Sequence, residues 1–146
     1  MKKDSKGFSL LELLIVVAII LIIATIAIPS LLRSRQAANE SGAVATMRTI
    51  MTAEVSYQSS AQGSFGTLAQ LVGAGLLDAR FTSGTFGGFN YGITLDPTGT
   101  IFTANAEPAS TNTARYGYYE LSDGVVRYAT TTSEAPTGQS GNAVGG

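Results

Sequence analysis

Near its N-terminus the chain carries an apolar run that is long enough to cross a lipid bilayer. From Phe8 to Ile28 there are 21 residues, of which only Ser9, Glu12 and Thr25 are polar. As an α-helix, a segment of this length spans about 31 Å, which is close to the thickness of a hydrocarbon core of about 30 Å. We therefore expect this segment to be a transmembrane helix, which leaves room for one modest domain in a chain of 146 residues.

The distribution of lysine predicts how the segment is oriented. Lys2, Lys3 and Lys6 are the only lysines, and all three precede the apolar run. Positive charge next to a transmembrane helix favours the cytoplasmic side. We therefore expect the N-terminus to lie in the cytoplasm and everything after Pro29 to lie on the other side of the membrane.

The composition excludes most kinds of catalytic chemistry. The chain has no Cys and no His, so thiolate nucleophiles, disulfides and the commonest general base and metal ligand are absent. Beyond the leading lysines there are six Arg against nine acidic residues, a net charge of −3 that argues against a nucleic-acid surface. Four acidic residues are scattered over turns and strand ends without the spacing of a calcium loop: Asp78, Asp96, Glu120 and Asp123. We expect no enzyme activity, no cofactor and no metal site.

Glu12 is the residue of the apolar run that most needs an explanation, because an unpaired carboxylate in a bilayer is costly. In a plain signal anchor, Glu12 snorkels toward the cytoplasmic headgroups. In a cleavable secretory signal, Thr25 and Ala27 approximate a small-residue cleavage site, although the run is long for such a signal and Pro29 lies close to the cut.

A third interpretation uses the basic leader as well. Cleavage between Gly7 and Phe8 creates a positively charged amine on Phe8, and Glu12 lies one helical turn further on the same face. In an array of such helices, the amine of one chain can also meet Glu12 of a neighbour. Processing then supplies the partner that an ionisable residue in a membrane requires.

The segment GFSLLELLIVVAIILIIATIAIP resembles the class III signal of type IV prepilins and the related pseudopilins. The matching features are Gly7, Phe8, the hydroxyl residue after it, Glu12 at its spacing, and Pro29. The resemblance implies cleavage of the leader 1–7 by a prepilin peptidase, N-methylation of Phe8 by the same enzyme acting as N-methyltransferase, and an assembly role for Glu12.

The same resemblance implies a function and partners. It implies a structural subunit of a type IV pilus, which serves adhesion, twitching motility or DNA uptake, and which polymerises with identical or related pilins through its N-terminal helix. It also implies membrane lipid around the precursor in the bacterial inner membrane, and an assembly platform and ATPase at that membrane. The final location is then an extracellular pilus. A pseudopilin of a type II secretion system in the periplasm, and a monomeric membrane-anchored binding module, remain as alternatives.

The resemblance covers about the first 57 residues well and the rest only in outline. One departure concerns Leu21, because many pilins carry a Gly there that helps the helix unwind between that position and Pro29 during assembly. Leu favours a helix by about 1 kcal/mol relative to Gly. Local melting in this chain therefore depends on Pro29, which lacks the N–H that would bond the carbonyl of Thr25 and so predicts a bend.

Residues 29–60 are predicted to continue as an amphipathic helix that leads into the soluble part. Val44, Met47, Met51 and Val55 recur at spacings of three and four residues, which is typical of one apolar helix face. We interpret this face as the surface that docks onto a sheet.

Residues 61–129 are predicted to form a globular head. Thr67 is an expected N-cap for a short helix that ends near Ala74. Alternation, with turns at residues 96–99 and 122–124, predicts four antiparallel strands: FNYGITL, TIFTANA, RYGYYEL and VVRYAT. The predicted class is therefore α+β, with a long N-terminal helix packed on a four-stranded antiparallel sheet.

The remaining features of the head carry less information. Residues 130–146 are rich in Gly, Ser and Thr, so we expect a flexible tail. The strands contain tyrosines that we interpret as packing residues with solvated hydroxyl groups: Tyr116, Tyr118, Tyr119 and Tyr128.

Overall fold

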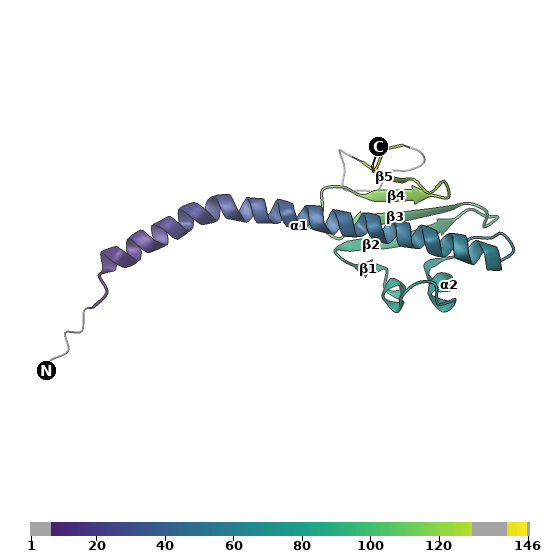
Figure 1. The fold of residues 1–146 in the computed structure, drawn as a ribbon, viewed down its shortest axis with the longest axis horizontal. Coiled ribbons are helices and arrows are strands. Elements are labelled where there is room, and N and C mark those ends of the chain that lie inside the picture. The colour runs from purple at the N-terminus through teal and green to yellow at the C-terminus, as the bar shows by residue number, and fades with distance from the viewer. Residues whose placement is uncertain (1–6, 130–139, 146) are drawn as a thin grey trace. The chain divides into compact units, whose positions relative to one another are not determined.

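The computed structural model describes residues 7–129 and 140–145 (Figure 1). Helix α1 (Leu10–Ser60) is followed by the short helix α2 (Leu68–Gly73) and the 3₁₀ helix η1 (Ala79–Thr82). The chain divides into two compact units, Met1–Ser34 and Arg35–Gly146. The first contains the apolar part of α1, and the second contains the rest of α1 together with the sheet.

In the described part of the second unit, six strands form an antiparallel meander in which each strand pairs with its neighbour in the sequence. They are β1 (Thr85–Phe86), β2 (Phe89–Leu95), β3 (Phe102–Pro108), β4 (Tyr118–Leu121), β5 (Val126–Tyr128) and β6 (Asn142–Ala143). The predicted α+β class, with a long helix on an antiparallel sheet, is confirmed. The predicted number of four strands is wrong, because β1 and β6 have two residues each and are too short to show an alternating pattern.

The second half of α1 covers one face of this sheet, as Figure 1 shows. The buried side of the helix recurs every three or four residues, as an amphipathic helix requires, and consists of Glu40, Ala43, Met47, Ile50, Ala53 and Glu54. The prediction of the apolar face of α1 was wrong at its C-terminal end, since Val55 is 50% exposed and Glu54 is buried in its place.

The sheet contributes an alternating set of side chains to the core under α1. Phe102, Ala104 and Ala106 of β3 are fully buried, as is Phe89 of β2. Ala43 and Ala53 of α1 belong to the same core cluster. The ring of Phe65, from the loop after α1, packs edge-on against Phe102 with centroids 4.8 Å apart.

Two local predictions are confirmed by side-chain hydrogen bonds. Thr67 is the N-cap of α2 and forms a capping box with Gln70, whose Oε1 accepts from the Thr67 backbone N–H at 2.8 Å. In the turn between β2 and β3, the Asp96 carboxylate accepts from the backbone N–H groups of Thr98 and Ile101 at 3.1 and 2.8 Å. A hydrogen bond from the Thr98 hydroxyl, with these N–H groups, lowers the pKa of Asp96 to about 2.

The last strand, β6, was not predicted. It pairs with β5, and next to it the Val144 N–H donates to the Val126 carbonyl at 2.8 Å. Residues 130–139 of the predicted flexible tail lie outside the described residues.

Among the buried carboxyl groups of the described head, Glu54 and Glu120 have oxygen atoms without a hydrogen-bond partner. Oε2 of Glu54 accepts from the Gly66 N–H at 2.9 Å, whereas Oε1 has no partner among the described residues. Neither oxygen of Glu120, which is 1% exposed, has a described partner. Burial raises the pKa of Glu54 to about 6, and burial together with the charge of Asp123 raises that of Glu120 to about 7, with Arg48 opposing.

We predict that the head becomes less stable as the pH rises. The pKa of Glu120 is raised in the folded chain from 4.5 to about 7, so the folded state binds the proton more tightly than the unfolded state within this window. The stabilisation is complete below pH 4.5 and is lost as the pH rises through about 7. The free energy of unfolding should fall by on the order of 3 kcal/mol across this pH range.

Glu120→Gln should remove the larger part of this dependence, because the amide stays neutral at every pH. The measurement is urea unfolding of the full chain in detergent micelles at about pH 5 and about pH 8, followed by tyrosine fluorescence. Glu107→Gln, at an exposed acidic position on β3, is the matched control. Equal pH slopes for the wild type and Glu120→Gln would contradict the assignment.

Candidate functional site: the start of α1 and a pocket in the head

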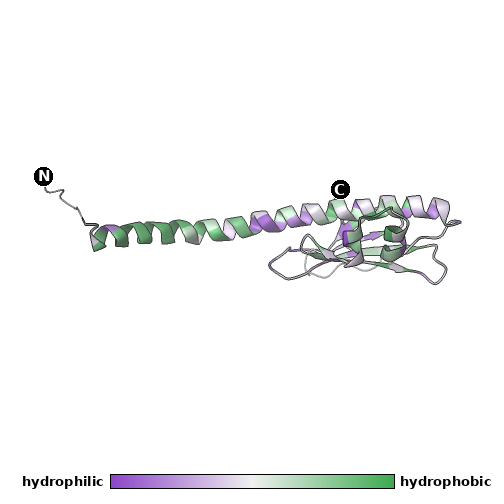
Figure 2. Cartoon of the chain, turned by 90° about the horizontal axis from the view of Figure 1, so that it is seen from below, coloured by the Kyte–Doolittle hydropathy of each residue, from purple (hydrophilic) through white to green (hydrophobic). Residues whose placement is uncertain are grey.

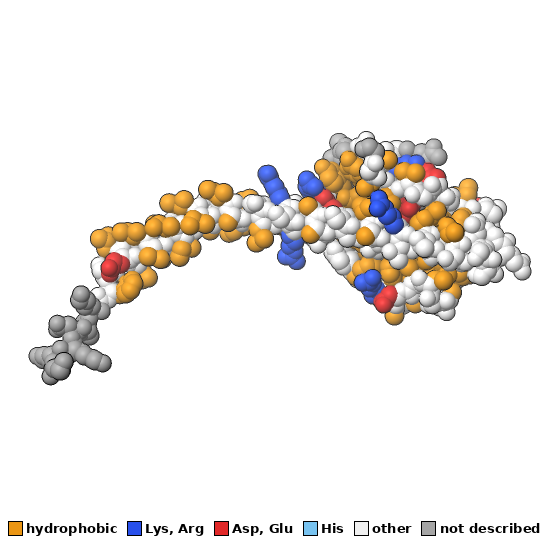
Figure 3. All heavy atoms as spheres, viewed as in Figure 1, with side chains coloured by type: hydrophobic (Ala, Val, Ile, Leu, Met, Phe, Trp, Pro, Cys, Tyr) orange, Lys and Arg blue, Asp and Glu red, His pale blue; other side chains and the backbone are white. Residues whose placement is uncertain are grey.

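The first unit presents its apolar side chains to the outside. The large hydrophobic residues between Phe8 and Ile28 are 47% to 81% exposed, and Figures 2 and 3 show hydrophobic residues all around this part of α1. Among the described residues, α1 is the one helix that is long and apolar enough to cross a membrane. Such a surface is stable only when lipid or other apolar helices cover it.

Ser9 and Glu12 cap the first turn of α1 with an arrangement that resembles a capping box, except that the Ser9 hydroxyl bonds the second helical N–H rather than the third. The Ser9 hydroxyl accepts from the Leu11 N–H at 3.3 Å, and Oε2 of Glu12 accepts from the Ser9 N–H at 2.9 Å. Glu12 therefore satisfies a backbone donor that would otherwise be left free at the helix start. The sequence analysis did not assign Ser9 a role, although the spacing Ser-x-x-Glu is the signal for this motif.

Gly7 and Phe8 precede this cap. Both are exposed, and Phe8 is 81% exposed. A Cβ atom added to Gly7 has no atom within 4 Å, so the fold places no steric demand on this glycine. The structure thus brings Glu12 to Ser9, while the pairing of Glu12 with a Phe8 amine requires a cleaved chain and stays a prediction.

Pro29 lies inside α1, which continues through it. Because Pro has no N–H, the carbonyl of Thr25 loses its helical partner. The Thr25 hydroxyl itself donates to the Ile22 carbonyl at 2.7 Å. The bend expected at Pro29 stays a prediction.

In the head, a buried carboxylate holds the loop before β4 against α1. Oε1 of Glu40 accepts from the backbone N–H and the Nε–H of Arg115 at 2.7 and 3.1 Å, and Oε2 accepts from Nη2 at 2.8 Å. These bonds to Glu40 raise the pKa of Arg115, so its guanidinium stays charged. The two residues are 75 positions apart, so no local sequence pattern predicts this pair.

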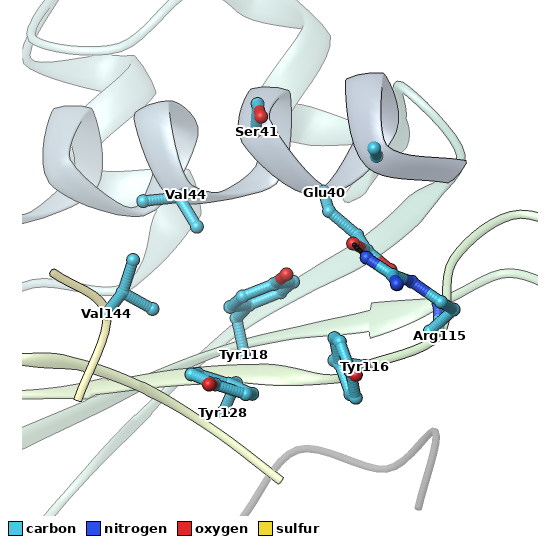
Figure 4. A pocket seen from close by; sticks show the side chains of 9 residues that line it. Glu40, Ser41, Val44, Arg115, Tyr116, Tyr118, Tyr128 and Val144 are labelled. Atoms are coloured by element: carbon cyan, nitrogen blue, oxygen red, sulfur yellow. Dashed lines mark hydrogen bonds and ion pairs between the residues drawn. The ribbon is translucent and has the colours of Figure 1, made fainter. Parts of the chain in front are cut away.

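This ion pair closes one end of a pocket of about 420 Å³ between α1 and strands β4 to β6 (Figure 4). Figure 4 shows Val44 and Val144 at the other end, with tyrosine side chains between. The ring of Tyr128 lies 5.2 Å from that of Tyr116 and 6.3 Å from that of Tyr118. Tyr116, Tyr118 and Tyr128 therefore pack against one another, as predicted, and also line an open pocket. The prediction is wrong for the hydroxyl of Tyr119, which is buried rather than solvated.

The described residues offer little for metal binding. Within residues 7–129 and 140–145 no group of three or more Asp or Glu side chains is placed to hold a metal ion. Asp78 caps η1 by accepting from the Arg80 N–H, and Asp123 pairs with Arg127 at 2.6 Å, so both have structural partners.

Comparisons with known proteins agree with the start of the chain. Residues 2–28 match the family model of the prokaryotic N-terminal methylation motif. The chain is 38% identical over 74 residues to the Type IV wide pilus major component PilA4 of Thermus thermophilus. The resemblance to type IV pilins is therefore confirmed.

The match to this pilin is partial. It covers 51% of this chain and 56% of the relative, so the chain spans little more than half the length of the pilin that it matches. No solved structure matches. The prepilin signal and the candidate transmembrane helix coincide in the same stretch of α1.

We predict that Glu40→Ala destabilises the head by about 2 to 3 kcal/mol, because it removes charge-assisted hydrogen bonds and leaves the Arg115 N–H without its partner. Glu40→Gln should lose less stability, because its amide oxygen can still accept a hydrogen bond from that N–H. Urea unfolding of the two variants in micelles measures the difference. Equal losses would contradict the role assigned to the backbone N–H bond.

Proposed function

We propose that this chain is the subunit of a type IV pilus, made as a membrane-anchored prepilin and polymerised through its N-terminal helix. One observation carries the proposal. The large apolar side chains of residues 8–28 are exposed, and Glu12 accepts a hydrogen bond from the Ser9 N–H in the first turn of this segment, inside a match to the prokaryotic N-terminal methylation motif. The similarity to a wide-pilus component supports the same role and a structural, non-enzymatic chain.

Processing takes place between Gly7 and Phe8. The exposed, unhindered glycine allows a protease to approach the backbone, and cleavage separates the lysine-containing leader 1–7 from residues 8–28. The prepilin peptidase then methylates the amine of Phe8. A secondary amine of this kind remains positively charged at neutral pH, as an α-amino group largely does.

Assembly transfers the apolar half of α1 from lipid to a bundle of identical helices. An apolar helix gains little hydrophobic free energy from this transfer, since both environments are apolar, so packing and polar contacts must direct it. Glu12 is the acidic residue of the segment, and a carboxylate at the centre of a membrane helix costs about 2.5 to 3.5 kcal/mol. Pairing with a Phe8 amine removes most of that penalty.

The capping geometry strengthens this role. Oε2 of Glu12 is held by the Ser9 N–H, which fixes the carboxylate beside the residue that becomes the second of the mature chain. Its other oxygen can accept from the amine of Phe8 in the same chain or in a neighbour. A charged pair that forms in one alignment selects the register of the bundle, as buried polar residues do in coiled coils.

The proposal places the chain in the bacterial inner membrane before assembly, with its N-terminus in the cytoplasm and the head outside. Its partners are other pilins, lipid, the prepilin peptidase, and an inner-membrane assembly platform with its ATPase. After assembly it belongs to an extracellular pilus that serves adhesion, twitching motility or DNA uptake. No nucleic-acid site is proposed.

The first experiment measures the intact mass and N-terminal sequence of the chain in sheared surface material and in membranes. A chain that begins at N-methylated Phe8 and is abundant in sheared material supports a surface pilus. The same mature chain confined to membranes favours a type II secretion pseudopilin. A monomeric membrane-anchored binding module would instead retain Met1 or be anchored without methylation, and that result would contradict the proposal.

We predict that Gly7→Val stops leader cleavage while leaving insertion and the head intact, because the fold makes no demand on Gly7. Intact mass of the membrane fraction should show the uncut precursor, and filaments should be absent. Ser5→Val, a change within the leader away from the bond, is the control and should be processed normally. Cleavage of Gly7→Val at the wild-type rate would show that the bond is assigned wrongly.

Two variants of Glu12 separate its capping role from its charge. Glu12→Val removes both, whereas Glu12→Gln keeps an acceptor for the Ser9 N–H and removes only the charge. We expect both to be cleaved and inserted, and both to lose filaments in sheared material by at least about tenfold, which corresponds to about 1.4 kcal/mol. Normal filaments from Glu12→Gln would contradict charge pairing and leave capping as the role of Glu12.

A further inference from the structure

The pocket in the head has no role in processing or in packing of the apolar helix. It is formed within the second unit, between residues 37–44 of α1 and the edge of the sheet at β5 and β6. Its volume of about 420 Å³ is large enough for one or two protein side chains, and its walls combine tyrosine rings with valines.

The charge at the pocket selects the kind of group that can enter. The Arg115 side chain is 50% exposed and lies 5.1 Å from the ring centre of Tyr116. Glu40 takes hydrogen bonds from Nε and Nη2 and balances the charge of Arg115, so Nη1 remains without a hydrogen-bond partner among the described residues. This remaining donor of a fixed guanidinium suits an apolar group that is accompanied by a carboxylate.

One segment of the head has this combination. Among the described residues of the second unit, the large apolar side chains that are exposed are Val55, Leu76 and Ile101. Leu76 is followed two residues later by the exposed Asp78, whose Oδ1 accepts from the Arg80 N–H and whose Oδ2 has no described partner.

The other two exposed side chains lack an available carboxylate. Glu54, next to Val55, is buried. Asp96, near Ile101, already accepts hydrogen bonds at both oxygens within its own turn. Leu76 with Asp78 is therefore the best match to a pocket of tyrosines beside Arg115.

Leu76 and the pocket lie at opposite edges of one sheet. The strand order runs from β1 to β6, and η1, which begins directly after Asp78, contacts β1. The pocket is lined by Tyr128 of β5 and by Val144 next to β6, at the other edge, and Figure 1 shows β1 with α2 on one side of the sheet and β5 on the other. A chain cannot fill its own pocket with this segment, but a second copy can.

We propose that the pocket binds the Leu76–Asp78 segment of a second copy of this chain, with Leu76 between the tyrosines and Asp78 paired with Arg115. Because the two surfaces differ and lie on opposite edges, the contact is heterologous and repeats from copy to copy, as a filament requires. The inference rests on the proposed filament function and adds an interface between heads to it.

The test uses the absence of cysteine from the chain. Ser41→Cys places a thiol at the exposed rim of the pocket, and Leu76→Cys places one on the segment. In assembled filaments, a short bismaleimide should link the double variant into dimers and longer ladders, while each single variant stays monomeric on a denaturing gel. Ser41→Cys with Ile101→Cys is the matched control and should not be linked.

A second measurement uses only the single variant Ser41→Cys. Its thiol should react with a bulky maleimide in dispersed subunits and be protected severalfold in filaments. Equal reactivity in both forms would show that the pocket stays open to another occupant and would overturn the proposal. Filaments that form without the Ser41–Leu76 cross-link would also overturn it, whereas the absence of filaments from the wild type would instead refute the proposed function.

The proposed ion pair between Asp78 and Arg115 is tested with Asp78→Asn, which removes the charge but keeps the side-chain oxygen that caps η1. We expect severalfold less cross-linking and filaments that disperse at lower salt than the wild type. Glu107→Gln removes an exposed negative charge elsewhere and should behave as the wild type. Equal effects of the two substitutions would contradict a specific contact with Arg115.

Discussion

The exposed apolar surface at the start of α1 is the constraint on which the rest of the molecule depends. Between Phe8 and Ile28 the large hydrophobic side chains are left exposed by the part of the chain that the structure describes, so water is excluded as their final environment. Lipid and a bundle of identical helices are the two covers that fit a helix that is apolar on every side. Transfer of the helix from lipid to the bundle changes the hydrophobic free energy little. A polar group is therefore needed to fix how each helix aligns with its neighbours.

Glu12 is suited to this task because of where its carboxylate is held. The hydrogen bonds between Ser9 and Glu12 satisfy backbone donors at the start of the helix and keep one carboxylate oxygen within a turn of Phe8, which the proposed cleavage would turn into a charged terminus. The same group can therefore stabilise the helix of the precursor and, after processing, offer an ion pair. A valine at this position would insert into lipid more easily but would leave the alignment of neighbouring helices undefined.

The sequence predicted elements whose signals are local and missed those that depend on distant contacts. The alternation of FNYGITL and the cap at Thr67 were sufficient for β2 and α2, whereas two-residue strands such as β1 carry no period. The apolar stripe on α1 was placed one residue too far at Val55 because Glu54 is buried instead, and its burial depends on the N–H of Gly66 in the following loop. The pocket was likewise invisible, since Glu40 and Arg115 meet only when the sheet folds against α1.

The edges of the sheet explain how a head of this kind can pack closely against copies of itself without aggregating. A long exposed edge strand invites pairing with any other edge, and short edge strands are one way to prevent this. Here β1 and β6 have two residues each, so the outermost strands themselves offer few backbone groups for strand addition, although residues 92–95 of β2 extend past β1 and pair with β3 alone. Contacts between heads must then come from side chains, and side-chain contacts are specific to shape and charge. In the proposed filament, a tyrosine pocket beside one edge and an exposed leucine with an aspartate beside the other would provide that specificity, and because the two surfaces differ, each contact would orient the next copy in the same direction.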